Sequence, residues 1–310
     1  MASLTNRKMV ATLTGAIGIC LWATETVLVT FTTGLPTLQI VALAFAVASL
    51  LSPLAWKLTG GSPLDAFRQP LSVWLVTVPC LVLYHACIYY AVHRVPATPA
   101  ALLHGATPLF IVLGSALLPG ERLRWWHLAG AGLGATGMFW LVDSGGRSDL
   151  QLNSDVVFYL ACIGLAAGLW GVYSLVSRQF GDVPSGAMGT FYAVAAIAAG
   201  IGHLMLETWV TPSPNQIMAI VALGLLPMGL ALYFWDHGVK CGDIQALGAT
   251  SYVEPLIGAF LVVALGQGEL HWTMLLSGAL IIAGSILAAG SLWNSSVDSR
   301  LALEAKEQVV

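Results

Sequence analysis

Charged residues are scarce in this sequence. Asp, Glu, Lys and Arg together make up 9% of the 310 residues, whereas an ordinary soluble domain carries about 25%. Hydrophobic residues account for 57%, and the mean hydropathy over the whole chain is +0.83. These values exclude a soluble domain with an apolar core and a polar surface, and they indicate a polytopic membrane protein.

Several chemical signatures are also missing. The cysteines form no CxxC pair, so the sequence predicts neither a disulfide nor a metal site from Cys20, Cys80, Cys87, Cys162 and Cys241. No Walker motif is present to bind a nucleotide, and no His/Asp cluster has the spacing of metal ligands. A net charge of -3 gives no reason to expect a nucleic-acid partner. We therefore expect no cofactor and no catalytic activity.

The sequence does contain a series of long apolar segments. A membrane-spanning helix needs about 20 mostly apolar residues, and ten segments meet this requirement: 10–30, 37–56, 71–92, 97–118, 123–141, 156–177, 186–206, 216–235, 244–264 and 272–292. The first follows Arg7 and Lys8, as in a signal peptide, but it is too long and contains Glu25, so it is interpreted as a retained spanning helix. The short connections exclude a separate soluble domain.

The few charged residues fit this map. Glu25 and Glu254 are the two acids inside the segments, and no Lys or Arg lies deep within one. If the N-terminus is cytoplasmic, all of the 12 basic residues except Arg94 and Arg147 fall on the cytoplasmic side. This asymmetry follows the positive-inside rule. It predicts an even number of spans, cytoplasmic N- and C-termini, and a short cytoplasmic tail over 294–310.

The two halves of the chain resemble each other at a shift of 147 or 148 residues. The shift aligns Trp22 with Trp170, Pro79 with Pro227, Pro108 with Pro255, and Gly120-Glu121 with Gly268-Glu269. Each half then holds five spans, so the second copy enters the membrane from the opposite side. The sequence therefore predicts an all-α polytopic membrane protein of ten transmembrane helices, with inverted five-helix repeats over 1–149 and 150–293.

Polar and aromatic residues at membrane depth are the candidates for a binding site, because such positions are energetically costly and usually face protein or water. A spacing of three residues places two side chains on one helix face. Four pairs have this spacing: Trp22 with Glu25, Trp170 with Tyr173, His104 with Thr107, and Ser251 with Glu254. The third segment adds Tyr84 and His85 from the stretch YHACIYY. Together they predict a substrate site near the bilayer midplane, between the repeats.

Some of these residues allow a second interpretation. Side chains near span ends usually belong to the interfacial belt, which is the interpretation favoured for Tyr89, Tyr90, Trp235 and Asp236. Glu25 and Glu254 are alternatively buried, protonated acids that bond to a neighbouring helix. The prolines inside the spans are expected to act as hinges or helix breaks: Pro79, Pro108, Pro227 and Pro255.

The residue types also limit the ligand. A strongly anionic group would need Lys or Arg, which the candidate site lacks. A neutral, zwitterionic or cationic molecule fits better. Its ammonium group would meet Glu25 or Glu254, while an aromatic side chain stacks on Trp22, Trp170 or Tyr84. Inverted repeats favour a secondary transporter that works by alternating access; a channel and a membrane-embedded enzyme are the alternatives.

One motif resembles a known family. Glu254-Pro255, Gly268-Glu269 and the glycine-rich stretch from Gly278 to Gly284 are similar to the signature of EamA-type exporters in the drug/metabolite transporter superfamily. The first half departs from it, because Thr107 stands where many members carry glutamate. The resemblance implies a bacterial inner-membrane exporter of aromatic and other neutral amino acids, with a monomer sufficient for transport. A multidrug or cationic-amphiphile exporter is the alternative, and both proton coupling and facilitated diffusion are compatible with it.

Overall fold

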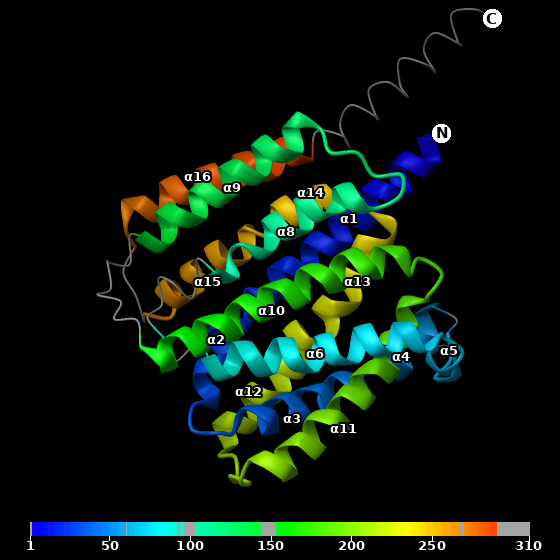
Figure 1. The fold of residues 1–310 in the computed structure, drawn as a ribbon, viewed down its shortest axis with the longest axis vertical. Coiled ribbons are helices and arrows are strands. Elements are labelled where there is room, and N and C mark those ends of the chain that lie inside the picture. Colours follow the sequence, from blue (N-terminus) through cyan, green and yellow to red (C-terminus); the bar gives the residue numbers. More distant parts are fainter. Residues whose placement is uncertain are drawn as a thin grey trace, which may run out of the picture.

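The computed structural model describes residues 2–59, 61–91, 94–95, 103–143, 153–266 and 270–289, and every regular element in them is a helix (Figure 1). The first half contains α1 (Ala2–Trp22), α2 (Glu25–Leu28), α3 (Thr37–Ser49), α4 (Ser52–Thr59), α5 (Leu64–Phe67), α6 (Leu71–Ala91), α8 (Thr107–Gly114) and α9 (Trp125–Asp143). The second contains α10 (Ser154–Gln179), α11 (Met188–Leu206), α12 (Pro214–Leu225), η4 (Leu226–Leu230), α13 (Ala231–Cys241), α14 (Ile244–Thr250), α15 (Val253–Ala264) and α16 (Trp272–Ala288). Arg147, Gly268, Glu269 and the tail over 294–310 lie outside the described residues.

Helix length and hydropathy agree with a membrane protein. Within the described residues, seven stretches are long and apolar enough to cross a bilayer: Asn6–Thr32, Thr37–Leu58, Leu71–Ala91, Ser154–Gln179, Ser185–Leu206, Pro214–Cys241 and Ile244–Ala264. Thr107–Leu117 and Trp272–Ala288 are shorter apolar helices. The prediction of an all-helical, polytopic membrane fold is therefore confirmed, whereas ten crossings and the side of the termini stay predictions.

The outside of the bundle is strongly apolar. Leu117 and Leu204, for example, are 85% and 81% exposed. Contiguous apolar surface of this kind is rare on monomeric soluble proteins, where it leads to aggregation. In a bilayer the same surface lies against lipid chains, so the exposed leucines are expected.

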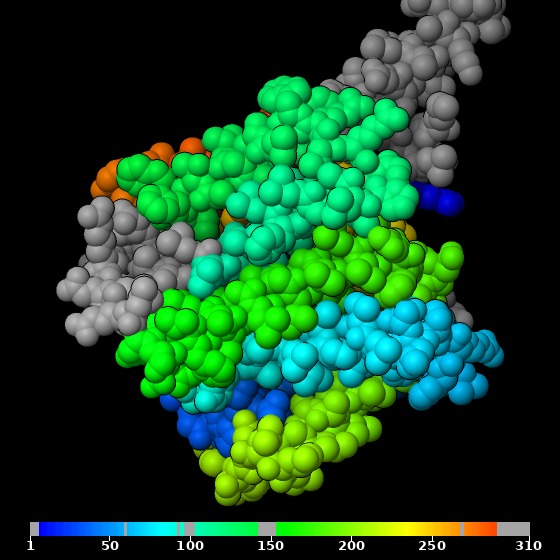
Figure 2. Space-filling view, in the orientation of Figure 1, coloured from blue at the N-terminus to red at the C-terminus, as the bar shows by residue number. Residues whose placement is uncertain are grey.

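The packing of the helices relates the two halves of the chain. Helix α1 packs on α13, and α6 packs on α10, which are equivalent contacts under the 148-residue shift. The remaining large contacts join equivalent segments to each other, namely α3 with α11 and α9 with α16. In Figure 1 the equivalent helices α1 and α10 run in opposite directions across the bundle. Figure 2 shows α9, α8, α10, α6 and α11 as successive bands across one face.

Three of the predicted spans are interrupted beside the candidate site residues. Turns at Ala23–Thr24, at Gly105–Ala106 and at Ser251–Tyr252 separate Trp22 from Glu25, His104 from Thr107, and Ser251 from Glu254. The expectation that each of these pairs shares one continuous helix is therefore wrong. Hydrophobicity does not reveal such breaks, because a turn of the chain inside an apolar segment leaves its composition unchanged. Only Trp170 and Tyr173 share an unbroken helix, α10.

Hydroxyl groups satisfy carbonyls near these interruptions. Thr24 Oγ1 donates to Leu21 O at 2.7 Å, and Thr107 Oγ1 donates to His104 O at 2.7 Å. Ser251 Oγ donates to Leu247 O at 3.0 Å. Such bonds from Ser and Thr to carbonyls three or four residues earlier favour bent helices. They supply polar partners where lipid would supply none.

The prolines have three different environments. Pro79 lies inside the continuous helix α6, whereas its repeat equivalent Pro227 lies in the π-helical turn η4. Pro108 and Pro255 lie in the first turns of α8 and α15. A missing N–H is harmless there, because the first four N–H groups of a helix have no partner within it. Whether any of these prolines acts as a hinge during transport stays a prediction.

Candidate functional site

Three tryptophans from three helices form the centre of the candidate site. The rings of Trp22 and Trp170, which are equivalent in the two repeats, lie 5.1 Å apart in an edge-to-face arrangement. Trp235 lies 5.2 Å from Trp22 and 6.2 Å from Trp170. All three are buried, with exposed fractions of 7% or less. The predicted pairing of Trp22 with Trp170 is thus seen as a direct contact between the halves.

Hydrogen bonds hold the indole rings of Trp22 and Trp235 in place. Trp22 Nε1 donates to Pro227 O at 3.0 Å, so the carbonyl of the π-helical turn fixes this ring. Trp235 Nε1 donates to Ser174 Oγ at 3.2 Å, and that hydroxyl donates to Trp170 O at 2.8 Å. A buried indole N–H usually finds such a partner. The rings of Trp22 and Trp235 are therefore fixed by polar contacts as well as by packing.

Tyr84 connects the tryptophans to the polar side of the site. Its ring lies 5.1 Å from that of Trp170 and 4.9 Å from that of His85. Its hydroxyl lies 3.0 Å from His104 Nε2, at hydrogen-bonding distance. His85 Nδ1 lies 2.7 Å from Leu81 O, and because a carbonyl only accepts, this nitrogen carries the hydrogen.

The two acids of the spans belong to the same cluster. Glu25 begins α2 and Glu254 lies in the first turn of α15, and these two helices pack against each other. Tyr89 donates a hydrogen bond to Glu25, and its hydroxyl also lies 3.7 Å from Met228 Sδ. Neither acid forms an ion pair within the described residues. Both acids are partly exposed.

The helix that carries Glu254 packs closely on the interruption between α1 and α2. A Cβ added to Gly258, one turn after Glu254, would lie 2.9 Å from Thr26 Oγ1 and 3.6 Å from Ala23 O. A side chain at this position would therefore push α15 away from α2. The close approach brings the helix that carries Glu254 onto the segment that carries Glu25, which neither the spacing nor the composition of the sequence reveals.

The remaining predicted site residues lie nearby with different roles. Tyr173 packs on Trp170 at 5.2 Å and donates to Met188 Sδ at 3.7 Å. Thr107 is buried and donates its hydroxyl to the backbone, so it is not a polar equivalent of Glu254. Ser251 likewise donates to the backbone. These hydroxyls therefore serve the helix interruptions, and the site's polar groups come mainly from the acids, Tyr84 and the histidines.

The assignment of Tyr89 and Trp235 to the interfacial belt is wrong. Tyr89 is 6% exposed and bonds to Glu25, and Trp235 is 0% exposed among the tryptophans. Tyr89 follows His85 by four residues, so a shared helix face was the available signal. Tyr90 does fit an interfacial position, since it is 39% exposed and the Arg94 guanidinium lies 4.2 Å from its ring centre.

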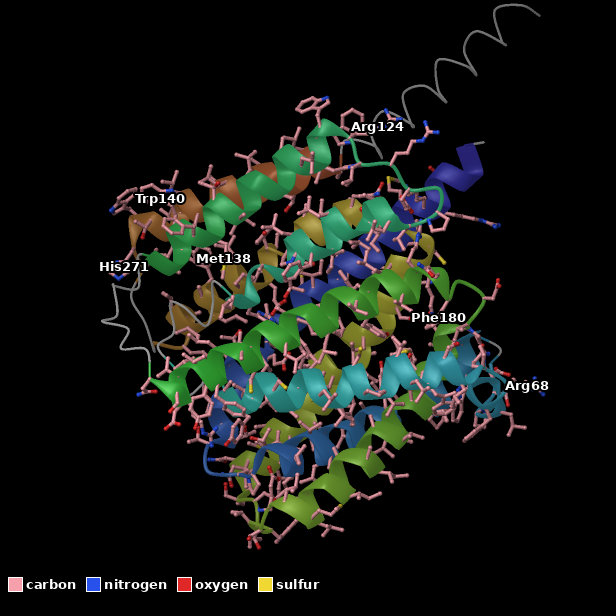
Figure 3. The ribbon with its side chains drawn as sticks, viewed as in Figure 1. Arg68, Arg124, Met138, Trp140, Phe180 and His271 are labelled. Atoms are coloured by element: carbon pink, nitrogen blue, oxygen red, sulfur yellow. The ribbon has the colours of Figure 1, made fainter. Side chains whose placement is uncertain are left out.

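Asp236 is also buried, but it belongs to a group of ion pairs at one end of the bundle. Arg68, Arg124 and Phe180 lie at this end, whereas Trp140 and His271 lie at the opposite end (Figure 3). We call the first of these the basic end; it also carries the ion-paired residues Lys8, Arg178 and Lys240. The N-terminus lies at the same end (Figure 1).

Each acid of this group has a basic partner. Lys240 Nζ lies 2.8 Å from Asp236 Oδ2, and Arg178 Nη2 lies 2.5 Å from Glu121 Oε1. Arg178 Nη1 also donates to the carbonyls at the end of α13, those of Val239, Lys240 and Gly242. Within the part of the chain that the structure describes, no group of three or more His, Cys, Asp or Glu side chains is placed to hold a metal ion.

Known proteins match this chain over most of its length. The chain matches the EamA-like transporter family twice, over residues 9–143 and 158–290. The aromatic amino acid exporter YddG of Ancylobacter novellus is 35% identical over 278 residues, which cover 90% of this chain and 96% of that protein. The pseudopaline exporter CntI of Pseudomonas aeruginosa is 26% identical over 258 residues, covering 82% and 84%. A crystal structure superposes with a TM-score of 0.84 at 34% identity, covering 93% of this chain and 99% of the other.

An apolar helical bundle that matches a transporter family over both halves defines a membrane transporter rather than an enzyme. The chain belongs to the EamA-like transporter family. It is a multi-pass protein of a bacterial inner membrane. The resemblance expected from the Glu254-Pro255 motif is thereby confirmed.

Proposed function

We propose that this transporter exports aromatic and other neutral amino acids from the cytoplasm. The observation that carries the proposal is the cluster in which Trp22, Trp170 and Tyr84 adjoin two acids without basic partners. Aromatic faces and edges bind an aromatic side chain by offset or edge-to-face contact. An uncompensated carboxylate at the same place suits an ammonium group.

An amino acid would bind with its two ends in different surroundings. Its ammonium group would lie between Glu25 and Glu254, where aromatic rings add cation–π attraction. Its carboxylate would accept hydrogen bonds from donors such as the hydroxyl of Tyr84 or a ring N–H of His104. The relatives named as exporters of aromatic amino acids support this substrate class.

We also propose ten spans in inverted repeats over 1–149 and 150–293, with the basic end in the cytoplasm and a monomer as the transporting unit. The two repeats would move against each other around the site, exposing it to each side in turn. Bending beside Pro79, Pro108, Pro227 and Pro255 would accompany this motion. Labelling of intact cells tests the topology: an impermeant thiol reagent should reach Arg147→Cys and not Arg68→Cys, and the reverse pattern would contradict it.

Transport in a purified system tests the substrate directly. Protein in liposomes should move labelled tryptophan or phenylalanine well above empty vesicles, and the flux should saturate. Trans-stimulation of this flux would favour a carrier over a channel. Flux equal to that of empty vesicles across a broad panel of amino acids would contradict the proposal.

A second candidate is the export of drugs or cationic amphiphiles. The two neighbouring acids among aromatic rings favour it, because they would also bind a flat organic cation. Competition separates the two candidates. Neutral amino acids should inhibit tryptophan flux if the first is right, whereas inhibition by cationic dyes alone would favour the second.

A further inference from the structure

A hollow on the outer surface is separate from the aromatic site. It lies between α1 and α13 at the basic end and has a volume of about 400 Å³. Its lining consists of Asn6, Arg7, Val10, Ala11, His237 and Cys241. Of these, Ala11 is buried and forms the floor, whereas the other five are exposed. The hollow therefore opens outward, away from the tryptophans.

Close packing behind the floor seals the hollow from the interior. A Cβ added to Gly238 would lie 2.7 Å from the Cα of Gly15, so the two backbones touch there. A Cβ added to Gly242 would lie 2.9 Å from the backbone nitrogen of Thr12. Small residues allow two helices to approach this closely in a membrane. The occupant of the hollow must therefore come from outside the bundle.

An apolar stripe continues from the hollow along α1. Val10, Leu13 and Ile17 recur at helical spacing and are 58%, 58% and 54% exposed. Side chains three and four residues apart line one face of a helix. This face is suited to an extended hydrocarbon chain that runs from the basic end toward the middle of the bilayer.

The rim of the hollow is positive. None of its lining residues is acidic, and Arg7 supplies a permanent charge. Two nearby acids are occupied by other cations: Asp243 by Lys8 at 3.0 Å and Asp236 by Lys240 at 2.8 Å. Arg7 with Asn6 and His237 thus offers hydrogen-bond donors at this end of the bundle, which suit a phosphate group.

We propose that this hollow binds an anionic phospholipid, with its phosphate against Arg7 and His237 and one acyl chain along Val10, Leu13 and Ile17. Basic pockets between transmembrane helices bind anionic headgroups in this manner. The bound lipid would cover Cys241, which lies in the lining, but not Cys162, which is partly exposed on α10 and lies outside the lining. The proposal does not depend on which substrate the transporter carries.

The two cysteines provide the test. The full-length protein in detergent is alkylated with N-ethylmaleimide, with phosphatidylglycerol or phosphatidylcholine added, and the modification of each cysteine is followed by peptide mass spectrometry. At nine-tenths occupancy, phosphatidylglycerol should slow the alkylation of Cys241 about tenfold. Phosphatidylcholine should not, and Cys162 should react at the same rate throughout.

Variants test whether the residues at the rim of the hollow cause the protection of Cys241. Arg7→Ala and His237→Ala should lose the protection of Cys241, whereas Arg68→Ala, an exposed basic residue at the same end, should keep it. The rate at Cys162 checks that each variant retains its fold. Equal protection by both lipids, or unchanged protection in Arg7→Ala, would overturn the proposal.

Discussion

Acidic residues inside the bundle occur in two regions of this protein, and the regions differ in whether a basic side chain pairs with the acid. At the basic end, Asp236 and Glu121 each lie within ion-pair distance of Lys240 or Arg178. In the aromatic cluster, Glu25 and Glu254 lie on the packed helices α2 and α15 and have no basic partner among the described residues. A paired acid contributes to the fold, whereas an unpaired one beside a second acid leaves a place for a cation. The difference separates structural acids from those proposed to bind substrate.

The largest expected effect on stability is at the basic end. Asp236→Asn leaves the ammonium group of Lys240, whose side chain is 5% exposed, buried without its counter-charge. Loss of one partner from a buried pair lowers the free energy of unfolding by about 3–5 kcal/mol. Chemical unfolding in micelles measures it. Asp65→Asn is the matched control, because its partner Arg68 is 73% exposed and such pairs contribute about 0.2–1 kcal/mol; equal losses in both variants would break the distinction.

In the aromatic cluster the expected loss is one of transport. Trp170→Ala removes ring contacts with Trp22, Tyr84 and Tyr173 and the surface on which a substrate would stack. Each aromatic pair contributes about 0.5–1.5 kcal/mol, so tryptophan flux should fall by about 10- to 100-fold. Trp125→Ala, at a 68% exposed position, is the control and should transport normally. Wild-type flux in folded Trp170→Ala protein would contradict the assignment of this ring to the substrate site.

Replacing an unpaired acid should change transport and spare the fold. Glu254→Gln keeps the shape of the side chain and leaves no basic group without its partner, so the stability should change by less than about 1 kcal/mol. If Glu254 carries the coupled proton, the variant should lose any pH dependence of tryptophan flux. A flux whose pH dependence matches that of the wild type would make Glu254 structural, and Asp65→Asn again serves as the control.

The smallest effect is expected at the hydroxyl that holds Glu25. Tyr89→Phe removes the hydrogen bond to this acid and keeps the ring beside His85. A hydrogen bond contributes about 1 kcal/mol, so the apparent affinity for tryptophan should fall by about fivefold. The exposed Tyr90→Phe should have no effect. A larger loss in Tyr90→Phe than in Tyr89→Phe would contradict the placement of Tyr89 in the site.

Much of the fold was accessible from the sequence. Hydropathy alone predicts the apolar helices, and the 148-residue shift predicts that Trp22 and Trp170 are equivalent, which their ring contact supports. Both signals depend on composition and spacing, which are properties of the chain itself. The motif around Glu254-Pro255 likewise indicated the family correctly.

The details of the site were less accessible. The predicted eighth segment ends at residue 235, but the helix continues to Cys241, so Trp235 lies inside the bundle rather than at an interface. The interruptions at Ala23–Thr24 and Ser251–Tyr252 depend on local hydrogen bonds, and the meeting of Glu25 with Glu254 depends on how α15 packs against α2. Such features arise from tertiary contacts, which no single stretch of sequence contains.

The central claim is that the aromatic and acidic cluster carries an amino acid across the membrane. Uptake of labelled tryptophan into liposomes, compared for the wild-type protein, Trp170→Ala and empty vesicles, tests it most directly. We predict saturable wild-type flux, inhibited by unlabelled neutral amino acids and reduced at least about tenfold in Trp170→Ala. Flux that does not exceed that of empty vesicles, or that is equal in the wild type and the variant, would contradict the claim.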